Sequence, residues 1–84
     1  NKTVPLSVLN FLAHDLDENV RYAVATKRKL SRELFDLLAN DVSVSVRHTI
    51  GINPKVPLDI VNLLSNDKDD WLRDKMREKL ANLQ

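Results

Sequence analysis

The strongest constraint in this 84-residue sequence is an internal repeat with a period of 26 residues. Sliding the chain against itself by that offset aligns three gapless copies, 3–28, 29–54 and 55–80, followed by a short extension, 81–84. Three columns are identical in all copies: Leu12/Leu38/Leu64, Asp15/Asp41/Asp67 and Arg21/Arg47/Arg73. Such self-similarity is the signature of a repeat array, so residues 1–84 are predicted to form a single domain of three stacked units.

Each copy has the pattern of two helices. Apolar residues recur at helical spacing on both sides of a polar turn, and the first helix opens at Pro5, Ser31 or Pro57, residue types favoured at helix starts. Each helix pair leaves an apolar side that only a neighbouring pair can cover. The prediction is an all-α fold, an α-α superhelix (a right-handed solenoid) with helices near 5–14, 18–26, 31–40, 44–52, 57–66 and 70–82.

Composition excludes several classes of protein. The chain has no cysteine, so it has neither disulfides nor a thiolate metal site, and its apolar runs are too short for a membrane span or a signal peptide. These features favour a cytoplasmic protein. The formal net charge of +1 points to no bulk attraction to nucleic acid or membranes.

The pattern Leu37-Leu38-x-x-Asp41-x4-Val46-Arg47-x-x-Ile50 resembles HEAT-type helical repeats of the armadillo-type fold. Asn53-Pro54 followed by Pro57-Leu58-Asp59 is similar to the bacterial leucine-rich-repeat-variant version, from which Lys27-Arg28 of the first copy departs. The resemblance implies stacked helix pairs, and a role as a scaffold, an adaptor, an enzyme accessory or, in some families, a DNA-binding superhelix.

The repeated Asp and Arg residues predict a structural ladder. Each Arg lies in the first turn of a second helix, where the helix dipole disfavours a cation, so a carboxylate is expected to compensate it. The partner is either the Asp six residues earlier or the Asp of an adjacent copy. The alternative is a row of phosphate-binding arginines. The residues concerned are Asp15, Arg21, Asp41, Arg47, Asp67 and Arg73.

Charge is segregated between the two edges of the array. The turns 14–19, 40–45 and 66–71 hold seven acids and one base. In 27–32 and 53–58, by contrast, all of the charged residues are basic. Helix dipoles account for this distribution, and binding of phosphate or of an acidic partner is the alternative. We call the bases the basic rim: Lys27, Arg28, Lys29, Arg32 and Lys55.

The second helices carry the remaining candidate binding residues. Trp71 replaces Asn19 and Ser45 in its column and is expected either to cover the end of the array or to anchor a partner. Tyr22, His48 and Asp74 share a variable column, the kind of position that solenoids use for recognition.

No catalytic motif and no metal motif is present, so neither a cofactor nor an enzyme activity is expected. The sequence favours a non-catalytic protein-binding or scaffold module, with a nucleic-acid-binding helical repeat that uses the basic rim as the alternative.

The two ends of the array differ. Lys68, Lys75 and Arg77 replace small or apolar residues of the other copies, which predicts a polar outer face on the third copy. The first copy has no such change. Its apolar N-terminal face is expected to be covered by further repeats of a longer protein or by self-association.

Overall fold

A computed structural model describes residues 4–83, which form six α-helices and no strand. The all-α prediction is confirmed, and the helix ends lie within two residues of the expected ones. The helices are α1 (Leu6–Leu12), α2 (Glu18–Ala25), α3 (Arg32–Ala39), α4 (Val44–Gly51), α5 (Leu58–Leu64) and α6 (Asp70–Asn82).

Side-chain caps explain where most of the helices begin. The hydroxyl of Ser31 accepts a hydrogen bond from the backbone N–H of Leu34, and Asp17, Ser43 and Asp69 cap α2, α4 and α6 in the same way. Each cap satisfies a backbone donor that has no partner within the helix. Pro5 and Pro57 occupy the corresponding position before α1 and α5 and supply no side-chain cap.

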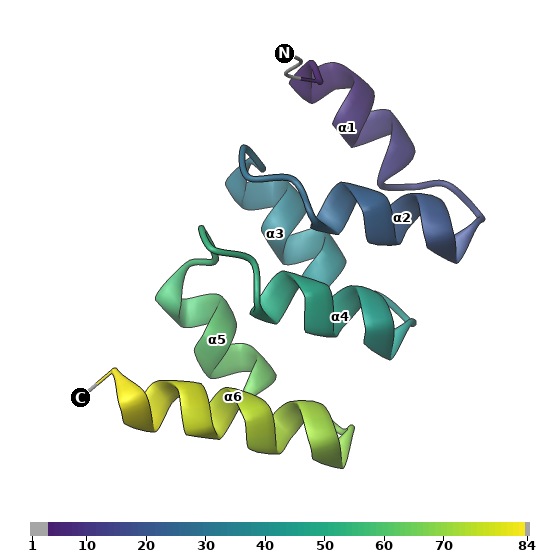
Figure 1. The fold of residues 1–84 in the computed structure, drawn as a ribbon. Coiled ribbons are helices and arrows are strands. Elements are labelled where there is room, and N and C mark those ends of the chain that lie inside the picture. Colours follow the sequence, from purple (N-terminus) through teal and green to yellow (C-terminus); the bar gives the residue numbers. More distant parts are fainter. Residues whose placement is uncertain (1–3, 84) are drawn as a thin grey trace.

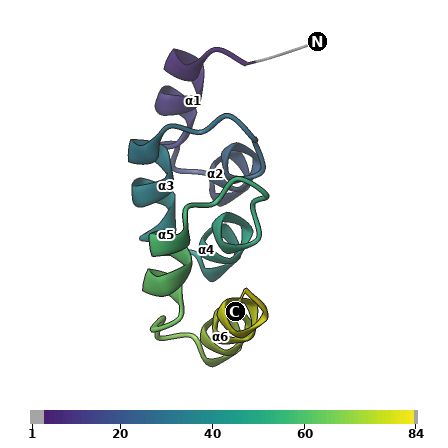
Figure 2. The same ribbon diagram turned by 90° about the vertical axis from the view of Figure 1, so that its left-hand side faces the viewer.

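The helices lie in two layers. Figure 2 shows α1, α3 and α5 stacked on one side and α2, α4 and α6 on the other. Within the second layer, α4 contacts both α2 and α6. The turns that join the helices of a pair lie at one edge of the molecule, and the linkers between pairs lie at the opposite edge (Figure 1).

The core lies between the two layers and repeats from pair to pair. Leu38 and Leu64, two of the three identical leucines, are at most 1% exposed, and Val46, Ile50 and Met76 are equally buried. Apolar burial of this kind is the main favourable contribution to folding. Leu34, Leu38, Val46 and Ile50 of the second pair are matched at the 26-residue offset by Ile60, Leu64, Leu72 and Met76 of the third, all of them buried, so these two pairs have equivalent cores.

Gly51 marks a close contact between two second helices, α4 and α6. A Cβ atom built at this position would lie 2.7 Å from the sulfur of Met76 on α6 and 3.3 Å from Cδ1 of Leu64. The equivalent residue of the first pair, Ala25, is fully buried. A small residue at this position therefore lets the following pair dock.

We expect Gly51→Leu to lower the free energy of unfolding by about 1–3 kcal/mol, because the larger side chain overpacks the contact with Met76. Gly51→Ala should be close to neutral, since the flexible end of Met76 can move and alanine favours the helix by about 1 kcal/mol. Urea unfolding measures both, with Ala81→Leu at an exposed site of α6 as the control. Equal stability of the alanine and leucine variants would contradict a tight contact.

Candidate functional site

The repeated arginines join one helix pair to the next. Arg21, near the start of α2, donates from Nε to Asp41 Oδ2 at 2.8 Å and from Nη2 to Asp41 Oδ1 at 3.1 Å. Its Nη1 also donates to the backbone oxygens of Asp15 and Leu16, at 2.8 and 3.2 Å. One guanidinium thus fixes the turn before its own helix and binds the aspartate of the following pair.

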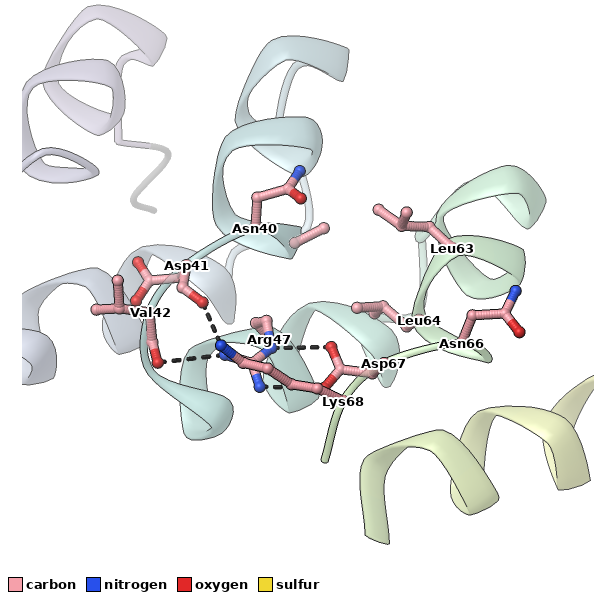
Figure 3. Close-up of a pocket in the computed structure, with 10 residues that line it drawn as sticks. Asn40, Asp41, Val42, Arg47, Leu63, Leu64, Asn66, Asp67 and Lys68 are labelled. Atoms are coloured by element: carbon pink, nitrogen blue, oxygen red, sulfur yellow. Dashed lines mark hydrogen bonds and ion pairs between the residues drawn. The ribbon is translucent and has the colours of Figure 1, made fainter. Parts of the chain in front are cut away.

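Arg47 repeats this geometry one pair further along. It donates to both carboxylate oxygens of Asp67, at 2.9 and 3.1 Å, and to the backbone oxygens of Asp41 and Val42 (Figure 3). Arg47 is 6% exposed. Of the two partners that the sequence left open, the carboxylate is therefore that of the next copy, and the aspartate six residues earlier contributes only its backbone oxygen.

The third arginine behaves differently. Arg73 lies near two exposed acids of its own helix, 2.9 Å from Asp70 and 3.5 Å from Asp74. We use the term Arg–Asp ladder for the two inter-pair links, Arg21–Asp41 and Arg47–Asp67. Because both guanidinium groups already hold bidentate carboxylates, this geometry favours the structural ladder over a row of phosphate-binding arginines.

A hollow of about 300 Å³ lies beside the second link of the ladder, between the second and third pairs (Figure 3). Its polar lining consists mainly of groups that are already bonded. Arg47 and Asp67 bind each other, and Asn66 Oδ1 lies 3.4 Å from a guanidinium nitrogen of Arg77. The amide nitrogen of Asn40 donates to the backbone oxygen of Asp36. This occupied lining leaves little polar capacity for a ligand.

The ladder shifts the pKa values of its aspartates. Burial raises the pKa of the Asp41 and Asp67 carboxyl groups, but hydrogen bonds from the arginine and from a backbone N–H outweigh burial and hold both values below the ordinary one. The N–H groups belong to Ser43 and Asp69, two residues further along the chain. Both carboxylates are therefore ionised at neutral pH.

The basic rim is partly neutralised. Arg32 donates to Asp36 on its own helix and to both carboxylate oxygens of Asp59, the second residue of α5. The other four members, Lys27, Arg28, Lys29 and Lys55, are exposed at the edge that carries the inter-pair linkers (Figure 1).

Trp71 lies on the outer surface of the second layer. Its ring packs edge-on against His48 of α4 with the centroids 4.5 Å apart, and the Lys75 ammonium lies 5.8 Å from the Trp71 centroid. Trp71 therefore contacts the preceding pair, and the expectation that it covers the end of the array is wrong. Burial lowers the pKa of His48, and the Lys75 charge lowers it further.

Tyr22 holds the position on α2 that His48 holds on α4. Tyr22 is 46% exposed and Trp71 is 54% exposed, so both rings have an accessible face. We call Tyr22, His48 and Trp71 the aromatic strip. Asp74, which shares the column of Tyr22 and His48, is exposed and lies near Arg73.

Of the three cations that the sequence places on a polar outer face of the third copy, only one lies there. Val42, equivalent to Lys68, is 89% exposed although pairs lie on both sides of it, so this column points to solvent in every copy. Lys75 lies near the Trp71 ring and thus faces the preceding pair. Arg77 alone fits the expectation, because it donates to the backbone oxygen of Ser65 across the outer side of the third pair.

Several contacts between pairs have no counterpart in the sequence analysis. Asn53 is 3% exposed, and its amide donates to the backbone oxygens of Ala25 and Lys27 at 3.0 and 2.8 Å. Lys79 donates to the oxygen of Gly51 at 2.8 Å, and burial lowers its pKa. Lys27, Asn53 and Lys79 share one repeat column, but their different side chains give no sequence signal of a common role.

Other kinds of site find no support in the part of the chain that the structure describes. Within residues 4–83 there is no group of three or more His, Asp or Glu side chains that could hold a metal ion. None of the described helices has the length and apolar character needed to cross a membrane. Comparison with protein-family models, with curated proteins and with solved structures finds no match to this chain.

The ladder predicts unequal effects for two arginines of the same column. Arg47→Ala should lower the free energy of unfolding by about 1–3 kcal/mol, because it leaves the buried Asp67 carboxylate without its partner. Arg73→Ala should cost less than about 1 kcal/mol, since Arg73 pairs with exposed acids. Urea unfolding at neutral pH provides both values, and equal losses would rule out a special role for the inter-pair link.

Acid should weaken the ladder. The pKa values of Asp41 and Asp67 are lower in the folded chain than in the unfolded chain, so their contribution is complete above the ordinary pKa of about 4. It is then lost as the pH falls through the folded values. We expect the free energy of unfolding to be lower at about pH 3 than at about pH 6, and the difference to be smaller in Asp67→Asn. An equal drop in both proteins would show that other groups cause the acid sensitivity.

Proposed function

We propose that this chain is a non-catalytic protein-binding module, an α-solenoid of three HEAT-like helix pairs that presents the outer side of its second helices to another protein. The 26-residue repeat, the two layers of helices and the recurrence of the same Arg–Asp link support the solenoid. Arg21 and Arg47 each bind a carboxylate through two hydrogen bonds, which supports a structural role for these arginines.

The aromatic strip carries the proposal. Trp71 leaves 54% of its surface accessible, while the His48 ring packs edge-on against it and the Lys75 ammonium lies over its face. A half-exposed tryptophan on a packed helix can bury a large apolar area against a partner with little loss of side-chain freedom, which is why tryptophan and tyrosine dominate binding hot spots.

The exposed apolar residues of the turns differ from the strip. Leu16 and Val42 are 99% and 89% exposed, and they project from turns. Isolated apolar side chains of this kind are common on soluble proteins. They therefore provide matched controls for the strip.

Nucleic-acid binding by the basic rim is the alternative. Four exposed cations at one edge support this alternative, and the pairing of Arg32 with Asp59 and Asp36 argues against it. A footprint of four charges is small for a protein whose affinity depends on phosphate contacts.

A peptide selection tests the proposal. Peptides displayed on phage are selected against the immobilised chain, and the Kd of the enriched peptides is measured for single variants. Trp71→Ala should raise Kd about tenfold or more, because it removes the tryptophan ring that is expected to bury a large apolar area against the peptide. Val42→Ala should leave Kd unchanged. Urea unfolding of each variant verifies that it is folded.

Two outcomes would contradict this function. In the first, the selected peptides bind Trp71→Ala and Val42→Ala equally well. In the second, the chain binds duplex DNA tightly at about 50 mM salt, loses that affinity steeply at about 200 mM, and fails to bind after Lys27, Arg28 and Lys29 are changed to Glu. The second outcome would establish the alternative.

A further inference from the structure

The first helix pair exposes apolar residues whose equivalents in the other pairs are buried. Val8 is 42% exposed, whereas Leu34 and Ile60 in the same column are each 2% exposed. Leu12 is half-buried, whereas Leu38 is fully buried. The difference arises because the second and third pairs each have a preceding pair to cover these positions.

Leu12 is also part of the lining of a hollow. It has a volume of about 510 Å³ and lies between α1 and α2, with Lys27 and Asn19 as its polar members and an apolar lining of Val4, Leu9, Leu12, Val20, Ala23 and Val24. Leu9 is only 2% exposed, so it belongs to the core and forms the floor. Val20 is half-buried, whereas its equivalent in the second pair, Val46, is fully buried.

Asp15 is oriented like the ladder aspartates. Its Oδ1 accepts a hydrogen bond from the backbone N–H two residues further on, at 2.8 Å, as do Asp41 and Asp67 at 2.9 Å. In Asp41 and Asp67 the same carboxylate also receives the guanidinium of the preceding pair. Among residues 4–83, no arginine fills this role for Asp15.

Lys27 occupies a repeat column whose other members donate hydrogen bonds to the preceding pair. Asn53 and Lys79, its equivalents, donate to the oxygens of Ala25 and Gly51, the last residues of α2 and α4. Lys27 is exposed at the edge of the hollow. It is therefore placed to donate to the C-terminal carbonyl of an incoming helix.

The far side of the third pair does not match this face. A docking pair needs a small residue where Ala25 and Gly51 stand, and the third pair has Arg77 there, bonded to its own Ser65. Arg73 is also held by Asp70 and Asp74. Stacking of a second copy in this direction would place a long cation in the contact.

We infer that the hollow, together with Asp15 and Lys27, docks a further helix pair of the same pattern. Its second helix supplies an arginine for Asp15, a small residue over Val24 and a terminal carbonyl for Lys27. The occupant follows from continuity with the two contacts already described, in which each pair covers these same columns of the next. The inference concerns a different surface from the aromatic strip and does not depend on it.

An extended chain tests the inference. A second copy of residues 29–54 is inserted between Lys2 and Thr3, which preserves the 26-residue register and places the inserted arginine 20 residues before Asp15, the spacing of Arg21 and Asp41. The extended chain should be monomeric and should unfold at a higher urea concentration than the parent chain.

A double-mutant cycle isolates the predicted link. Asp15→Asn keeps the acceptor for the Asp17 N–H but removes the charge, so it should hardly affect the parent chain. In the extended chain it should lower the ratio of folded to unfolded protein about tenfold, because a partly buried arginine loses its carboxylate. The effect should vanish when the inserted arginine is changed to Ala.

Three results would overturn the inference. The first is that neither this extension nor a second one, built from residues 3–28, adds stability. The second is that Asp15→Asn has the same effect in the parent and extended chains. The third is that the parent chain forms dimers that Leu12→Lys dissociates, since a second copy would then cover the hollow. Trp71→Ala should leave the added stability unchanged, which separates this test from that of the aromatic strip.

Discussion

The link between an arginine of one pair and an aspartate of the next determines how the pairs are arranged. Arg47 holds the turn oxygens of its own pair and the carboxylate of Asp67 at the same time. Apolar burial supplies most of the favourable free energy but has little directional preference, whereas a bidentate guanidinium–carboxylate pair fixes both distance and angle. The link therefore sets the register in which the cores of adjacent pairs meet.

Features that recur at the same column could be predicted from the sequence. The six helices and the identity of the ladder residues repeat at 26 residues, so each copy supplied independent support for the others. The choice between the two possible partners of Arg47 could not be made in this way. Both aspartates recur at a constant offset, and only the path of the chain between pairs shows which carboxylate is within reach.

Features that differ between the copies could not be predicted correctly from the sequence. Asn53 and Lys79 perform the same task, donation to the last carbonyl of the preceding second helix, with different chemical groups. A column that contains Lys, Asn and Lys shows no pattern until the acceptor is known. The side on which Trp71 packs depends on its rotamer and on His48, a residue from another pair, so position along the helix did not determine it.

One column controls whether a pair can accept a successor. A second helix approaches the next one where Ala25 or Gly51 leaves room: a Cβ atom at Gly51 would lie 2.7 Å from the Met76 sulfur, a contact that a small shift of Met76 relieves, whereas a longer side chain would not fit. Arginine in this column removes that room, and its length lets it reach back to a carbonyl oxygen of its own pair. On the opposite face, the Asp15 carboxylate is oriented like those of Asp41 and Asp67, and an apolar hollow is open. The two faces are thus chemically unequal, and the contact between pairs has a direction: a face with an arginine and a small residue meets a face with an aspartate and apolar residues.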